Sequence, residues 1–300
     1  MANLKAIRKR ISSVKSTQKI TRAMKMVSGA RLNRAQQRIL AMRPFAQRIS
    51  EVLCEVVAAI QASGLETPHP LLARREEKRI LILLLTGDRG LCGAFNANLN
   101  KRAEALWKAK QAEGIEVSFA TVGRRGRDYF RRRSAPLFAD FEGVWEDIGL
   151  EKARLIGRRL LAPFLTGEVD AVYLVYAEFK TAMTQEVQCR PLLPLDLPPV
   201  ATPEAEQGRD VQLRPEYLFE PDQSSIFERL VPMYIGATLL RALFDSFASE
   251  LGARMTAMDS ATKNAADMIS KLTLSYNRQR QSVITTELIE IIAGSEALQG

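Results

Sequence analysis

The chain has 300 residues, of which 46% are hydrophobic and 26% charged, a composition typical of a folded soluble protein and unlike that of a disordered or collagen-like chain. Three scattered cysteines and a single histidine, His69 between two prolines, argue against a disulfide framework, a zinc site and chemistry that needs paired histidines. The net charge of +9 is uneven, because the first fifty residues carry thirteen Lys or Arg and no Asp or Glu.

The first segment, from about Asn3 to Ala59, is predicted to form a long helix. Its first apolar residues are spaced by three and four, which places them on one helical face: Leu4, Ile7, Ile11 and Val14. An apolar seam continues only if a three-residue stammer is allowed, through Thr17, Ile20, Met24 and Val27. Pro44 is expected to kink or interrupt the helix, and Gln61–Pro70 resembles its end and a linker.

The middle of the chain changes from a helical period to alternating strands and helices. Strands are expected at Arg79–Leu85, Ile115–Val122, Val169–Phe179 and Glu186–Leu193. Helices are expected at Asn96–Glu113, Arg124–Arg132 and Leu150–Leu165. Pro194–Pro215 is predicted to be an exposed loop, followed by an edge strand at Tyr217–Phe219. This alternation indicates an open α/β sheet, and apolar runs such as Ile80–Leu85 are far shorter than the ~20 residues that span a bilayer.

The last segment, from about Met233 onward, is predicted to be a second long helix of roughly 90 Å. It carries a heptad seam made of Leu251, Met255, Met258, Thr262, Ala265, Ile269, Leu272, Tyr276, Gln279 and Val283. Two long helices on either side of a folded middle predict an antiparallel coiled coil. The fold class is therefore α+β, a long coiled coil of the terminal helices plus a central α/β (Rossmann-like) domain, with boundaries at 1–70, 71–220 and 221–300.

A glycine-rich turn follows the first predicted strand and contains Gly87, Asp88, Arg89 and Gly90, ending at Gly93. It resembles a phosphate-binding turn, but it lacks the spacing of the dinucleotide fingerprint and the Gly-Lys-Ser/Thr of the P-loop. A tight turn with close backbone packing is the better interpretation, with Asp88 and Arg89 available for a subunit contact. Cys92 is interpreted as a small buried residue rather than a reactive thiol, and the arginines around Arg124 and Arg131 as solvated surface.

The basic first segment allows three interpretations. It could be a nucleic-acid-binding arm, although no aromatic residue precedes Phe45 to stack on bases. It could be an organelle transit peptide, although the helical face begins already at Leu4. It could also be a stalk helix whose charges face acidic loops of other subunits. Composition alone does not choose among them.

Motifs at both ends and in the middle of the chain carry a resemblance to one family. They are Ile7–Ile11, Thr17–Val27, Gly87–Asn96, Arg254–Ala265 and Tyr276–Ile291. Together they are similar to the signatures of the gamma subunit of F-type ATP synthase, in the same order and over essentially the whole chain.

The resemblance implies a rotating central shaft that is itself non-catalytic and holds no cofactor or metal. Its implied partners are the alpha and beta subunits of the catalytic head, the epsilon subunit and the membrane c-subunit ring, with no nucleic acid and no direct membrane insertion. It implies that ion flow turns the ring and the shaft, and that the shaft drives the beta sites through different affinities. The implied location is the cytoplasmic face of a bacterial inner membrane, as a peripheral protein.

The resemblance also suggests residue roles. Contacts with beta are expected at Arg254, Arg280, Gln281, Met24 and Lys25. An apolar tail is expected to turn in a hydrophobic bearing near the top of the head, formed by Leu288, Ile289, Ile292 and Leu298. For each residue the alternative is ordinary coiled-coil packing or solvation. The proline-rich loop contains no cysteine pair, so the thiol switch of chloroplast relatives is not expected.

Overall fold

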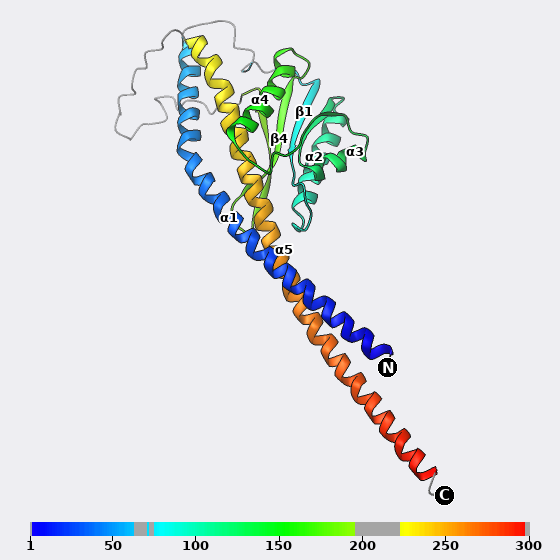
Figure 1. Cartoon of the computed structure of the whole chain (residues 1–300). Coiled ribbons are helices and arrows are strands. Elements are labelled where there is room, and N and C mark those ends of the chain that lie inside the picture. Colours follow the sequence, from blue (N-terminus) through cyan, green and yellow to red (C-terminus); the bar gives the residue numbers. More distant parts are fainter. Residues whose placement is uncertain (1, 63–70, 72–74, 196–222, 298–300) are drawn as a thin grey trace, which may run out of the picture. The chain divides into compact units, whose positions relative to one another are not determined.

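The structure is a computed structural model that describes residues 2–62, 71, 75–195 and 223–297 (Figure 1). The chain forms two compact units, one of residues 1–30 and 254–300 and the other of residues 31–253. Two long helices contribute to both units, α1 (Ala2–Ala62) and α5 (Gln223–Ala297). The expected strand at Tyr217–Phe219 and nearly all of the expected loop lie outside the described residues.

A five-stranded sheet lies at the centre of the larger unit. Its strands are β1 (Arg79–Leu85), β2 (Glu116–Val122), β3 (Leu137–Phe141), β4 (Ala171–Phe179) and β5 (Gln185–Leu193). They are ordered β3-β2-β1-β4-β5. The first four in chain order run parallel, and β5 returns antiparallel to β4 as a hairpin. The predicted α/β organisation is therefore confirmed.

Helices cover both faces of the sheet, as Figure 1 shows for α2 (Phe95–Ala112), α3 (Arg124–Arg131) and α4 (Leu150–Leu165). Strand β1 shows how the faces divide, because successive side chains of a strand point to opposite sides. Ile80, Ile82 and Leu84 pack in the cluster that includes α2 and Phe130 of α3. Leu81, Leu83 and Leu85 pack in the cluster that includes α4 and parts of α1 and α5. Burial on both faces explains why this strand is a continuous apolar run.

Both long helices pass through a proline without a break. Pro44 lies inside α1, so the expectation of an interruption there is wrong. Pro232 lies inside α5, whose described part begins at Gln223, so the helix includes residues before the segment that starts at about Met233. Both prolines are exposed to solvent, so water can bond the carbonyl groups that lose their donors. The described part of α1 extends to Ala62, and the rest of the expected linker at Gln61–Pro70 lies outside the described residues.

Strand β3 was not predicted from the sequence. It is an edge strand of five residues with no fully buried side chain, so it lacks the apolar run and the clear alternation that mark the other strands. Its pairing with β2 shifts register between Phe119 and Ala120. Within the described residues, α5 contains a window with a mean hydropathy of 1.2 that could suit a membrane span; 61% of it is buried inside the protein, as in an ordinary core helix.

Candidate functional site

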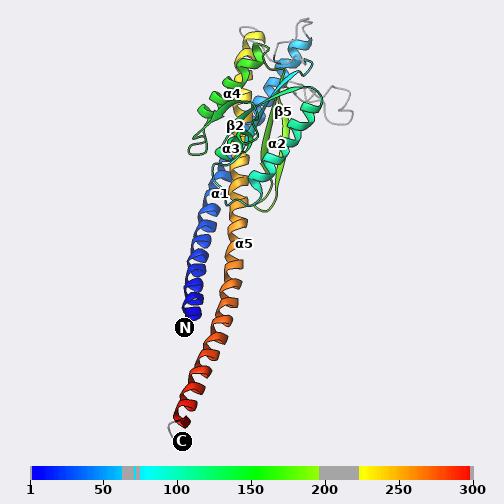
Figure 2. The ribbon, with the colours of Figure 1, turned by 90° about the vertical axis from the view of Figure 1, so that its right-hand side faces the viewer.

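In the smaller unit, α1 and α5 lie side by side and run antiparallel (Figures 1 and 2). Three contacts set their register. The hydroxyl oxygens of Thr21 and Thr262 are 2.8 Å apart, and Lys25 Nζ lies 2.5 Å from Asp259 Oδ1. A Cβ on Gly29 would lie 3.4 Å from the sulfur of Met255, so the helices approach closely there. Along these contacts the residue numbers increase on α1 and decrease on α5, which confirms the predicted antiparallel pair.

On α5 the predicted heptad seam matches the burial. Every seam residue from Met255 to Val283 is buried or half-buried, and from Lys263 to Ser282 every residue between seam positions is exposed. Small or polar side chains occupy several of these positions, such as Ala265 at 8% exposure. The two helices therefore approach closely along a narrow seam, unlike the helices of a leucine-rich zipper.

On α1 the predicted stammer is wrong. Half-buried or buried positions continue at spacings of three and four through polar residues: Leu4, Ile7, Ile11, Val14, Gln18, Thr21, Lys25 and Ser28. Met24 and Gly29, each next to one of these positions, are also half-buried. The apolar residues that suggested a shifted seam face solvent instead, with Ile20 58% and Val27 54% exposed. The physical reason is that Thr21 and Lys25 find polar partners on α5, so the helix keeps its register without an apolar side chain at those positions.

An ionic cluster joins the two helices at Asp259. Its carboxylate accepts hydrogen bonds from Lys25 at 2.5 Å and lies 3.0 Å from the ammonium group of Lys263. The hydrogen bond from Lys25, followed by that from Lys263, lowers the pKa of Asp259. Because the side chains of Lys25 and Asp259 are 44% and 32% exposed, solvent screens this interaction. The cluster therefore favours the register of the pair more than it adds to stability.

The expected beta-contact residues lie at separate places along the pair. Arg254 and Met24 are half-buried, Arg280 and Gln281 are exposed, and Lys25 forms its ion pair with Asp259. The register set by Thr21 and Thr262 places Leu4 opposite Gln279. Helix α5 extends beyond the beginning of α1 in both views (Figures 1 and 2).

Beyond Val283 the described part of α5 has no residue of α1 opposite it, and residues 284–295 are all exposed. The expected apolar tail lies here, with Leu288 54%, Ile289 61% and Ile292 58% exposed. Leu298 lies outside the described residues. A run of exposed large apolar side chains on one helix is the kind of surface that marks an interaction site.

In the larger unit, the glycine-rich turn packs tightly against the turn between β2 and α3. The amide of Gly87 donates to Asn96 Oδ1 at 2.9 Å, and the carboxylate of Asp88 accepts from the backbone amide of Arg124 at 3.0 Å, at the beginning of α3. The hydroxyl oxygen of Thr86 accepts from the amide of Gly126 at 2.8 Å. Asp88 therefore satisfies a helix-terminal donor from a distant turn, a role that sequence spacing did not reveal.

The crevice at the carboxyl ends of β1 and β4 is occupied by α5. In open α/β sheets this crevice, where the strand order reverses, is the usual place for a ligand. Here Ser246 of α5 donates a hydrogen bond to the carbonyl of Leu85 at 3.5 Å, and Ser249 donates to that of Ala177 at 3.3 Å. The carboxylate of Glu250 lies where a side chain on Gly87 would be, with its carbon 2.8 Å from that Cβ position. This packing supports the structural interpretation of the turn over nucleotide binding.

The other candidates from the sequence have structural surroundings. Cys92 is buried and accepts a hydrogen bond from the side chain of Asn96 at 3.1 Å, and none of Cys54, Cys92 and Cys189 forms a disulfide with another described residue. Arg124, Arg125 and Arg131 are exposed, as expected for solvated surface, but Arg127 of the same group is half-buried and pairs with Asp128, Asp140 and Glu142. His69 lies outside the described residues, and among the residues that are described no three His, Cys, Asp or Glu side chains are grouped to hold a metal ion.

Comparison with known proteins finds similarity over the whole chain. A family model described as ATP synthase matches residues 3–298. The ATP synthase gamma chain of Sorangium cellulosum is 52% identical, and that of Geotalea uraniireducens 44% identical, each over the full length of both chains. Among solved structures, a chain from the central stalk and c-ring of Tetrahymena thermophila mitochondrial ATP synthase is 23% identical with a TM-score of 0.59, covering 81% of this chain and 99% of that one. A chain of the Euglena gracilis mitochondrial ATP synthase rotor is 16% identical with a TM-score of 0.65, covering 94% and 99%. These two share the fold.

Proposed function

The chain belongs to the family of ATP synthase gamma chains, and from this membership we propose that it is the rotating central shaft that couples ion flow through a membrane ring to ATP synthesis or hydrolysis on other subunits. In this role it performs no bond chemistry and holds no nucleotide. Its partners are the alpha and beta subunits of the head, the epsilon subunit and the c-subunit ring. It acts as a peripheral protein at the cytoplasmic face of a bacterial inner membrane.

The observation that carries the proposal is the antiparallel pair of α1 and α5, whose contacting residues Thr21 and Thr262 are 241 positions apart in sequence. A shaft must resist bending and twisting, and two helices joined along a continuous seam do so better than one. It must also present different surfaces to its surroundings as it turns. The exposed Ile20 and Val27 on α1 and the ionic cluster at Asp259 provide that asymmetry.

The charge distribution supports the same role. Helix α1 has no acidic residue before Glu51, so its exposed lysines and arginines suit acidic loops on a surrounding subunit. Each exposed ion pair contributes only about 0.2–1 kcal/mol. Weak contacts are appropriate here, because a rotating shaft must break and remake them at every step.

We assign the contacts with beta to Arg280 and Gln281, which are exposed on α5. The tail with Leu288, Ile289 and Ile292 is assigned to an apolar bearing, because these side chains are exposed without a partner on α1 among the described residues. For Arg254, Met24 and Lys25, a contact with beta remains a proposal. Lys25 would have to make it while its ammonium group bonds Asp259.

The test is reconstitution of the full chain with alpha and beta subunits, followed by ATPase and proton-pumping assays in the complete enzyme. Arg280→Ala and Gln281→Ala are expected to lower coupled turnover by at most about fivefold each, as loss of an exposed polar contact allows. Lys271→Ala, which removes an exposed cation elsewhere on α5, is the matched control and is expected to behave as wild type.

Two outcomes would count against the proposal at different levels. Failure of the wild-type chain to assemble with alpha and beta would exclude the shaft assignment. Normal assembly with unchanged coupling in both variants would exclude only the contact assignment. Tight binding of DNA or RNA with a steep salt dependence would instead favour the nucleic-acid interpretation of the basic helix.

A further inference from the structure

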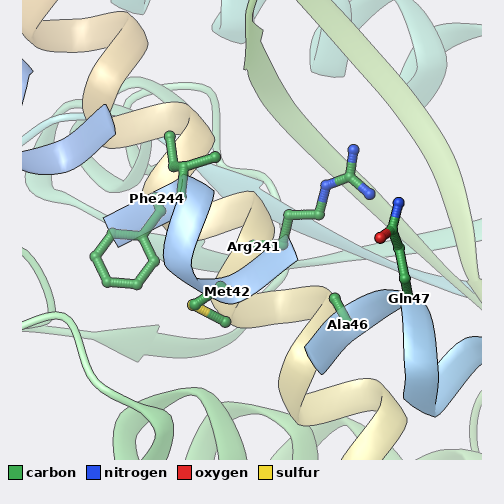
Figure 3. Close-up of a pocket in the computed structure, with 6 residues that line it drawn as sticks. Met42, Ala46, Gln47, Arg241 and Phe244 are labelled. Atoms are coloured by element: carbon green, nitrogen blue, oxygen red, sulfur yellow. The ribbon is translucent and has the colours of Figure 1, made fainter. Parts of the chain in front are cut away.

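A cavity of about 220 Å³ lies between α1 and α5 within the larger unit (Figure 3). None of its lining residues belongs to the helical seam or to the glycine-rich turn. Its lining comes from one stretch of each helix: Ile39, Met42, Ala46, Gln47, Arg241 and Phe244. At roughly 30 Å³ per molecule of liquid water, the space equals that of about seven waters, which is enough for a small organic molecule.

The lining is divided into an apolar part and a polar end. Phe244 is buried, Ile39 and Met42 are half-buried, and all three belong to or pack against the apolar core on this face of the sheet. Figure 3 shows the side chains of Arg241 and Gln47 extending toward one end, with Phe244 and Met42 at the other. A ligand that matched this lining would have an apolar body and a single polar head.

The polar end has unused hydrogen-bonding capacity. Arg241 pairs through Nε with Asp245 at 3.8 Å, and its side chain is 58% exposed, so its two terminal nitrogens are open to solvent or to a ligand. Gln47, the other polar residue of the lining, is also exposed. A guanidinium with free terminal nitrogens matches the two oxygens of a carboxylate or phosphate.

The electrostatic surroundings favour an anion. Within the larger unit, α1 contains five arginines and no Asp or Glu from Arg31 to Ser50. The acidic side chain that pairs with Arg241 is Asp245, which is only 8% exposed. A positive field over a partly open cavity raises the local concentration of anions.

We propose that this cavity binds an amphipathic monoanion, a medium-length alkyl chain that ends in a carboxylate. The chain lies against Ile39, Met42 and Phe244, and the carboxylate is held by Arg241 and Gln47. Because the cavity involves both long helices, a bound molecule would join them within this unit. No residue of the site is among the proposed contacts with beta, and the inference goes beyond the proposed role as a shaft.

Sodium decanoate is the probe, titrated into the purified full chain by calorimetry. The expected result is saturable binding of one decanoate with a dissociation constant of roughly 0.1–1 mM. Arg241→Gln is expected to weaken binding by about tenfold, because it removes a charge-assisted hydrogen bond. Ala46→Phe is expected to abolish binding, because it fills the space.

Two controls make the test specific. Arg229→Gln removes an exposed charge from α5 outside the lining and is expected to leave decanoate binding unchanged. Decyltrimethylammonium has a similar chain and a positive head, and it is expected to bind much more weakly than decanoate. The proposal is overturned if decanoate does not bind saturably, if Arg241→Gln leaves binding unchanged, or if the ammonium compound binds equally well. Arg241 is exposed, so its variant decides the matter even if Ala46→Phe fails to fold.

Discussion

Single residues matter most where the two turns at the carboxyl edge of the sheet meet. Gly123 has a φ of +97°, in the region that favours glycine. A Cβ at this position would lie 2.0 Å from the carbonyl oxygen of Thr86, a distance that no packing adjustment of a side chain can relieve. Any other residue at position 123 would therefore have both a strained backbone and a steric clash with the glycine-rich turn's neighbour Thr86.

Gly123→Ala is expected to lower the free energy of unfolding by about 3 kcal/mol or more, measured by urea denaturation. Gly114→Ala is the matched control, because Gly114 also has a positive φ, +79°, but has no atom within 4 Å of the Cβ position. It should cost only about 1–2 kcal/mol, from backbone conformation alone. Equal losses in the two variants would show that the contact with Thr86 does not matter.

The lowered pKa of Asp259 makes the stability of the helical pair depend on pH. A carboxyl whose folded pKa is below its unfolded value stabilises the fold above the unfolded pKa, and this stabilisation is lost as pH falls through the folded pKa. Asp259→Asn should therefore be slightly less stable than wild type at pH 7, and the difference should shrink below about pH 4. Asp267→Asn, at an exposed position, is the control. A difference that grows on acidification would contradict the assignment.

At the scale of elements, α5 acts as a part of the α/β unit as well as one helix of the pair. Ser246 and Ser249 are completely buried and bond the ends of β1 and β4. At Gly252, a Cβ would lie 3.1 Å from the carbonyl oxygen of Ala182 in the β4–β5 hairpin. Ser246, Ser249 and Gly252 lie within two turns of α5 and pack closely against the edge of the sheet. Only small residues are compatible with this close packing.

Ser246→Ala and Ser249→Ala are each expected to cost about 1–3 kcal/mol of unfolding free energy, because each leaves a buried carbonyl group with one hydrogen-bond donor fewer. Ser295→Ala is the control, since Ser295 is exposed and its hydroxyl bonds only its own helix, at Ile292. It should change stability by less than about 0.5 kcal/mol. Equal effects of buried and exposed serines in thermal or urea denaturation would refute this view of α5.

Sequence reasoning located the regular elements well where burial was complete and less well elsewhere. Strand β1 and helix α4 begin and end at the predicted residues, because both present strongly buried apolar patterns. Strand β3 was missed because an exposed edge needs no apolar pattern. The seam of α1 was misplaced because apolar Ile20 and Val27 are exposed while Thr21 and Lys25 are paired across the seam. Partners 241 residues apart cannot be recognised from spacing on one helix.

At the scale of the whole molecule, the described end of α5 is an apolar surface without a partner among the described residues. The described end of α5 exposes Ile284, Leu288, Ile289, Ile291 and Ile292, each by 45% or more. Both the apolar tail at this end of the chain and the glycine-rich turn were recognised as motifs from the sequence. The filling of the sheet's crevice by α5 was not, since nothing in a serine-containing helix indicates which carbonyl groups its hydroxyls will meet.

The double change Leu288→Asp and Ile292→Asp is expected to leave the stability of the isolated chain within about 0.5 kcal/mol of wild type, because both side chains are already exposed. Assembly with alpha and beta, measured by co-purification, should weaken at least tenfold if the tail lies in an apolar bearing. Ser282→Asp, at an exposed position before the tail, is the control. Undiminished assembly of the double variant would exclude the bearing.

The serine contacts of α5 also impose an order on biosynthesis. The five strands are all translated once Leu193 has emerged from the ribosome, yet Ser246 and Ser249 follow more than fifty residues later. Until then, the nascent sheet lacks the helix that completes one of its apolar faces, and non-local contacts of this kind form slowly. A growing polypeptide with that face uncovered is a natural client for ribosome-associated chaperones, and the release of a finished subunit waits on its final third.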